Sequence, residues 1–129
     1  ISGPLLDRFD LQLEIQPVNL SAFQKNGSSE ESSVTVKERI IAARNLQIKR
    51  AHMCNAYLSA SQLEQSCCCS HTDLLWLQKA CQQLQLSARA YHKVLKISRT
   101  IADLENSSAI QQKHLMEAMQ YRCFDRSWR

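Results

Sequence analysis

Glycine and proline are scarce in this chain, which contains two of each in 129 residues. An average protein of this length has about 15 of them. Many-stranded sandwiches and barrels need such residues at their turns, whereas helices are weakened by them. Because 44% of the residues are hydrophobic, the chain can also bury a core. The composition therefore predicts a mainly α fold. The sequence contains no apolar run of about 18 residues, so we expect no membrane span.

Start signals and helical spacing predict a bundle of five helices. Ser59 with Gln62, three residues later, has the pattern of a capping box, while Thr35 and Ser87 are candidate caps of two other helices. Three starts also carry apolar pairs typical of a hydrophobic staple: Leu58 and Leu63, Leu86 and Tyr91, Ile110 and Leu115. The expected helices cover 34–50, a segment after Ser59, 72–84, 88–105 and a segment from about 111.

Residues 9–16 have a different pattern, because apolar and polar side chains alternate. Leu11, Leu13 and Ile15 would share one face, which predicts a half-buried strand that Pro17 ends. One strand cannot form a sheet, so we expect this orphan strand to come from a longer protein, of which the chain is a piece. The expected division is the end of a preceding core domain at 1–18, a linker at 19–33, a helical domain at 34–122 and a tail at 123–129.

The six cysteines do not suit a disulfide framework, because Cys67, Cys68 and Cys69 are consecutive. With nearby histidines such as His71 they suggest a zinc site. However, three successive positions on a helix point about 100° apart and cannot converge on one ion. We therefore expect no metal site here, and interpret these residues as reduced thiols that pack in the core.

The segment 88–105 carries basic residues along one side: Arg89, Lys93, Lys96 and Arg99. A basic row on a helix is most simply a solvated face. Arg89 differs because it falls in the first turn, where the helix dipole disfavours a cation. An anion bound between the guanidinium and the helix end would reverse that effect, and phosphate is the natural candidate.

The net charge of +4 permits contact with phosphates but is lower than that of dedicated nucleic-acid modules. The sequence has no glycine-rich phosphate loop and no GxSxG or HExxH motif. We therefore expect this chain alone to be no enzyme and to bind no cofactor.

Three segments together resemble one family. Residues 2–10 read Ser-Gly-Pro-Leu-Leu-Asp-Arg-Phe-Asp, residues 86–104 contain Ser-Ala-Arg-Ala-Tyr-His and Thr-Ile-Ala-Asp-Leu, and residues 117–122 read Glu-Ala-Met-Gln-Tyr-Arg. They resemble the C-terminal part of magnesium-chelatase-like AAA+ ATPases, and their residues are most similar to those of the ComM (YifB) family. The implied fold is a helical lid domain, preceded by the last strand of the ATPase core at 9–16.

The resemblance also implies roles for individual residues. Arg8 matches the arginine finger, which acts in trans on the nucleotide of the neighbouring subunit, and Asp7 is its acidic partner. Arg89 matches the second-sensor arginine, which contacts nucleotide from the lid of its own subunit. Lys96 and Arg99 match supporting basic positions farther along the same helix.

For the longer protein, the resemblance implies ATP hydrolysis with Mg²⁺ in a cytoplasmic ring, expected to be a hexamer. Its partners would be other copies of itself and DNA, with no membrane. The implied work is branch migration or helicase activity in bacterial natural transformation. Two alternatives remain open: the ATPase subunit of a magnesium chelatase, and a non-catalytic helical interaction module.

Overall fold

The computed structural model describes residues 2–17 and 31–122, and this part of the chain is helical without any sheet. This confirms the mainly α prediction. A short helix near the N-terminus precedes the five expected ones, and a 3₁₀ turn joins two of them. The elements are α1 (Gly3–Leu6), α2 (Ser33–Ala51), η2 (Asn55–Tyr57), α3 (Ala60–Ser66), α4 (His71–Gln83), α5 (Ala88–Leu104) and α6 (Gln112–Gln120).

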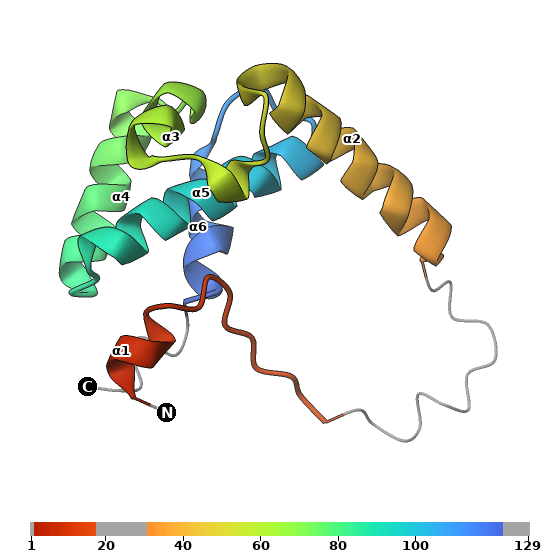
Figure 1. Cartoon of the computed structure of the whole chain (residues 1–129). Coiled ribbons are helices and arrows are strands. Elements are labelled where there is room, and N and C mark those ends of the chain that lie inside the picture. The colour runs from red at the N-terminus through yellow and green to blue at the C-terminus, as the bar shows by residue number, and fades with distance from the viewer. Residues whose placement is uncertain (1, 18–30, 123–129) are drawn as a thin grey trace.

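Helix α5 is the centre of the bundle, and it packs against α2, η2, α3, α4 and α6 (Figure 1). It buries Val94 and Leu95 on the side that faces its neighbours. Leu63 of α3, Leu77 of α4 and Leu115 of α6 complete the core and are almost fully buried. Helix α2 extends outward from this core, and α1 lies beside the end of α6.

Capping residues set most of the helix boundaries. The Ser59–Gln62 capping box starts α3, as predicted. Ser87 caps α5, because its hydroxyl accepts a hydrogen bond from the N–H of Ala90. The prediction for Thr35 was wrong: Ser32 caps α2 by accepting from the N–H of Thr35. The hydroxyl of Ser32 lies closer to the free N–H groups of the first turn than that of Thr35 would, so α2 begins at Ser33.

Residues 9–16 do not form the predicted strand in this structure. Gln12 makes a single parallel bridge with Arg122, in which the N–H of Gln12 donates to the carbonyl of Tyr121 at 2.8 Å. Leu11, Leu13 and Ile15 are 54%, 63% and 88% exposed, whereas Gln12 is buried. The expected burial of the apolar face is therefore wrong for this chain, because no described strand pairs with it.

The predicted linker falls mostly on residues 18–30, and the predicted tail is 123–129. Both lie outside the described residues, so the division into the end of a core domain, a linker, a helical domain and a tail stays a prediction. Among the described helices, none combines the length and the apolar character that crossing a bilayer requires.

Candidate functional site

The N-terminal end of α5 presents Arg89 to solvent. Arg89 is exposed in the first turn, and it forms no ion pair with any Asp or Glu in residues 2–17 or 31–122. The first N–H groups of a helix lack intrahelical partners and carry partial positive charge. The first turn of α5 therefore combines an exposed guanidinium with a helix end that favours an anion.

The segment that carries Arg8 lies against the same end of α5. Lys93 donates hydrogen bonds to the backbone carbonyls of Asp7 at 2.9 Å and Arg8 at 2.6 Å, and it pairs with Asp10 at 2.9 Å. The hydroxyl of Ser87 donates to the carboxylate of Asp7 at 3.2 Å. Lys93 is therefore no part of a solvated face, and no local pattern in the sequence predicts this contact.

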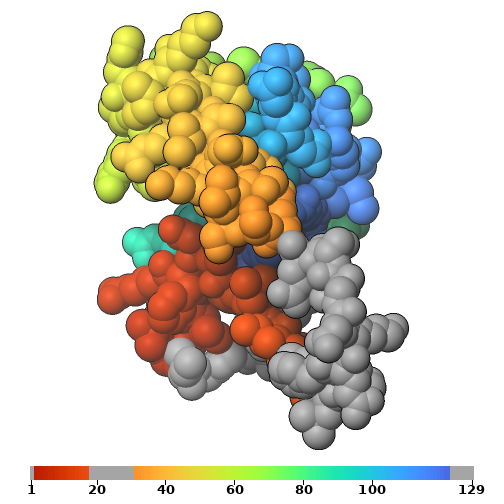
Figure 2. Space-filling view, turned by 90° about the vertical axis from the view of Figure 1, so that its right-hand side faces the viewer, coloured from red at the N-terminus to blue at the C-terminus, as the bar shows by residue number. Residues whose placement is uncertain are grey.

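Arg8 and Arg89 line one open cavity of about 1000 Å³. In Figure 2 the N-terminal segment (red) and α2 (orange) form two lobes of the surface, and lining residues of the cavity come from both. Lys93 and Lys96 of α5 also line the cavity, and Lys96 donates to the carbonyl of Ala56 at 3.0 Å. Its walls are largely apolar and include Leu58, Leu63, Ile97, Ile101 and Leu104. The cavity thus combines basic groups with an apolar lining, and the acidic residues Asp10, Glu105 and Glu117 also line it.

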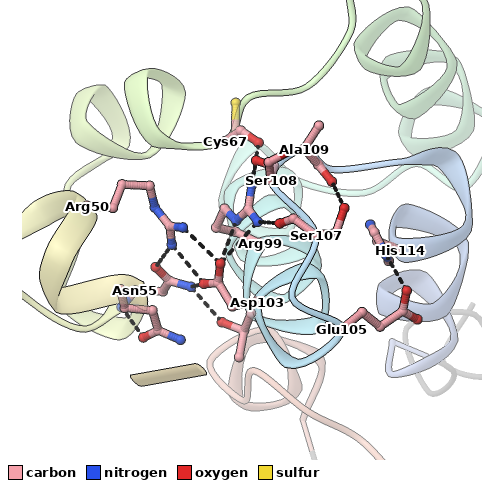
Figure 3. Close-up of polar contacts among 12 residues, drawn as sticks. Arg50, Asn55, Cys67, Arg99, Asp103, Glu105, Ser107, Ser108, Ala109 and His114 are labelled. Carbon is pink, nitrogen blue, oxygen red and sulfur yellow. Dashed lines mark hydrogen bonds and ion pairs between the residues drawn. The ribbon is translucent and has the colours of Figure 1, made fainter. Parts of the chain in front are cut away.

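Arg99 does not belong to this surface, although the sequence placed it in the basic row. Its side chain is fully buried and donates to the carboxylate of Asp103 and to the carbonyls of Cys67, Ser107 and Ser108 (Figure 3). The expectation of a solvated face was wrong for Arg99, while the supporting role that the resemblance implies stays a prediction. The signal that could have corrected it is Asp103, one helical turn later, which is the spacing of an ion pair.

Arg50 joins the same buried cluster from the end of α2. Its guanidinium pairs with Asp103 at 2.8 Å and donates to the side-chain carbonyl of Asn55. The hydrogen bonds that Arg50 donates to Asp103 raise the pKa of Arg50 above its ordinary value, against the opposing effect of burial. Gln47 accepts from the N–H of Asn55, so the cluster ties α2 and η2 to α5.

A smaller group surrounds the start of α6. His114 is fully buried, and its Nδ1 accepts from the N–H of Gln111 while its Nε2 lies 3.0 Å from Glu105. Hydrogen bonds from Lys113 and His114 lower the pKa of Glu105. The group fixes the loop between α5 and α6.

The three consecutive cysteines lie in a turn and not on a helix, which corrects the geometry assumed from the sequence. Cys67 is the C-cap residue of α3, and Cys68 has a left-handed backbone with φ 46°. The backbone of Cys69 forms an isolated parallel β-bridge with Ile110. Burial, with smaller effects of Asp73 and Cys67, raises the pKa of Cys69 to about 11, so its thiol stays protonated at neutral pH. Among the described residues, no group of three or more His, Cys, Asp or Glu side chains could hold a metal ion.

Comparison with known proteins identifies the family. The sequence profile of "Magnesium chelatase, subunit ChlI C-terminal" matches residues 30–122. The "Competence protein ComM" of Haemophilus influenzae is 44% identical over 126 residues, which cover 98% of this chain and 25% of that protein. The "Uncharacterized protein YifB" of Escherichia coli has the same identity and coverage.

A more distant relative, an uncharacterized protein of Mycobacterium bovis, is 28% identical over 126 residues. The chain spans about a quarter of the length of each of these curated relatives. The match and the helical structure agree with the resemblance found in the three sequence segments. The chain therefore belongs to the family of the magnesium chelatase subunit ChlI C-terminal domain and is a relative of ComM and YifB.

Proposed function

We propose that this chain is the C-terminal lid of a ring-forming AAA+ ATPase that uses ATP to process DNA. The observation that carries the proposal is the shared cavity of Arg8 and Arg89. Both guanidinium groups are exposed, and Arg89 stands at a helix end that favours an anion. Two such cations fit the phosphates of a nucleotide, where an arginine stabilises the charge that develops during phosphoryl transfer.

ATP and Mg²⁺ would be held mainly by the part of the longer protein that precedes these residues. ATP supplies the phosphoryl group, while Arg8 and Arg89 supply positive charge beside the phosphates. We expect the chain by itself to neither hydrolyse ATP nor bind it tightly. Calorimetry with the purified chain checks this, and a micromolar affinity for ATP would contradict it.

The shared cavity raises the question of which subunit's nucleotide Arg89 contacts. Both arginines of one chain line the same cavity. Arg8 is expected to act on the nucleotide of a neighbouring subunit, and Arg89 on that of its own. The expectation that Arg89 acts within its own subunit stays a prediction, and the two assignments differ in a mixing experiment.

In that experiment, a phosphate-loop variant of the full-length protein is mixed with Arg8→Ala or with Arg89→Ala. An arginine that acts in trans restores some activity in shared rings, because each variant supplies what the other lacks. Recovery with both variants supports action of both arginines on the neighbour. Recovery with Arg8→Ala alone supports Arg89 in its own subunit, and no recovery in proven mixed rings contradicts action of Arg8 in trans.

DNA as the partner is proposed from the similarity to ComM, whose name refers to competence. The test is ATP hydrolysis by the full-length protein with and without forked DNA. Stimulation by DNA supports the proposal. Hydrolysis that DNA does not change favours the alternative of a chelatase ATPase subunit, which the family description also fits. A full-length protein that neither binds nor hydrolyses ATP would favour an interaction module.

A further inference from the structure

We propose that Lys93 is a positioning residue that fixes Arg8 on the surface of α5. The inference rests on the proposed function, because it concerns how Arg8 is presented to a nucleotide. Lys93 belongs to α5, while Arg8 follows α1, and the two are 85 residues apart in sequence. A direct contact over that separation joins the two segments into one unit.

The ammonium group of Lys93 has no donor left for a ligand. A lysine ammonium has three N–H donors. Three acceptors lie within 2.6–2.9 Å of the Lys93 nitrogen: the carbonyls of Asp7 and Arg8 and a carboxylate oxygen of Asp10. Its side chain is only 16% exposed, although it lines the cavity. Lys93 therefore acts on the N-terminal segment of the chain and not on a molecule in the cavity.

The position of the two carbonyls makes this contact specific for Arg8. The carbonyl of Asp7 belongs to the peptide unit before the Arg8 Cα, and the carbonyl of Arg8 belongs to the unit after it. Because peptide units are planar, holding both oxygens restricts the two backbone dihedrals of Arg8. The Arg8 side chain itself is exposed and forms no ion pair within the described residues. Its backbone is held while its guanidinium stays available.

A second set of contacts reaches the same segment from the end of α6. Arg122 donates to the carbonyl of Phe9 and lies 3.4 Å from the Asp7 carboxylate. The N–H of Gln12 donates to the carbonyl of Tyr121. Removing Lys93 would therefore loosen the segment around Arg8 without releasing it completely, so a graded loss of activity is expected.

The test uses the full-length protein with Lys93→Met, which keeps the length of the side chain and removes its donors. We expect kcat for ATP hydrolysis to fall about tenfold, because displacement of a catalytic group by about 1 Å has effects of this order or larger. KM for ATP should change by less than about twofold. Lys93→Arg, which keeps a donor and the charge, should recover a large part of the rate. Lys79→Met on the exposed face of α4 is the matched control and should behave as wild type.

A double-mutant cycle with Arg8→Ala shows whether Lys93 acts through Arg8. If it does, Lys93→Met lowers the rate in the wild-type background and has no further effect in the Arg8→Ala background. Equal losses in both backgrounds would overturn the proposal, because Lys93 would then contribute independently of Arg8.

Amide hydrogen exchange measures the positioning itself, without reference to hydrolysis. The N–H groups of Arg8 and Phe9 are bonded to the carbonyls of Leu5 and Leu6. In Lys93→Met these amides should exchange faster, while those of 94–102 in α5 stay unchanged. Unchanged exchange at Arg8 and Phe9 would overturn the proposal, even if Arg8→Ala is inactive. If Arg8→Ala instead keeps full activity, the proposed function of Arg8 fails, and the exchange result alone decides whether Lys93 holds the segment.

Discussion

Two arginines on α5 have opposite environments. Arg99, near the middle of the helix, is 0% exposed, and each of its hydrogen bonds ends on an acceptor of the chain. Arg89, in the first turn, is exposed and has no carboxylate partner among the described residues. Burying a guanidinium is unfavourable unless its donors are satisfied, so Arg99 requires its cluster. The exposed Arg89 has no such requirement, and its charge is available to a ligand.

The contrast predicts that Arg99 contributes most to stability. Arg99→Met removes the Arg99 donor from the carbonyls of Cys67, Ser107 and Ser108 and leaves the Asp103 carboxylate with one cation, Arg50, in place of two. We expect the free energy of unfolding to fall by about 3–5 kcal/mol, as for the removal of one partner from a buried ion pair. Urea denaturation of the purified chain measures the change. A loss below about 1 kcal/mol would show that the cluster is not what holds α5 to its loops.

Ser87 tests how much the contact between the start of α5 and the N-terminal segment contributes to stability. Ser87→Ala removes the cap of α5 and the hydrogen bond to Asp7. A lost serine cap costs about 1 kcal/mol. Ser59→Ala, which removes the cap of α3 and no hydrogen bond to Asp7, is the control and should cost a similar amount. A greater fall in stability for Ser87→Ala than for Ser59→Ala would mean that the contact with Asp7 adds to the cap.

Glu105 provides a smaller, pH-dependent effect at the other end of α5. Its folded pKa lies below the ordinary value of 4.5, chiefly because of hydrogen bonds from Lys113 and His114. A lowered carboxyl pKa stabilises the fold above the ordinary value, and this contribution is lost as the pH falls through the folded pKa. Thermal unfolding between pH 6 and 3 should therefore depend less on pH in Glu105→Gln than in wild type. Parallel curves for the two proteins would contradict the assignment.

Arg89→Ala should have the smallest effect on stability. We expect a change within about 0.5 kcal/mol, in the stabilising direction, because a cation leaves the positive end of the helix dipole. In the full-length protein the same change should lower ATP hydrolysis by about tenfold or more. A loss of several kcal/mol in the isolated chain would make Arg89 structural and remove the contrast with Arg99.

Local signals predicted the helical bundle well, because they depend on a few adjacent residues. The Ser59–Gln62 pair and the Ser87 cap placed the starts of α3 and α5, and Leu63 and Leu115, expected in hydrophobic staples, are buried in the core. These features need no knowledge of distant parts of the chain.

Long-range features were less predictable. The burial of Arg99 depends on carbonyls of α3 and of the loop after α5, and the contact of Lys93 depends on residues 7–10. The alternation at 9–16 is a strand pattern, but a strand forms only when another strand pairs with it. Arg8 was singled out by the family resemblance, and Arg89 by its place in the first turn as well as by the resemblance. Their shared cavity appears only once the chain is folded.

The contact between the N-terminal segment and the end of α6 affects the order in which the molecule assembles. Phe9 and Arg122 are 113 residues apart, so their hydrogen bond closes a very long loop. Such a contact carries a large entropic cost until the intervening helices are in place, whereas α5 and α6 are neighbours in sequence and pack early. We therefore expect docking of residues 7–12 to be a late step of folding. Because the core of α3–α6 does not include these residues, the segment can also detach while the bundle stays folded.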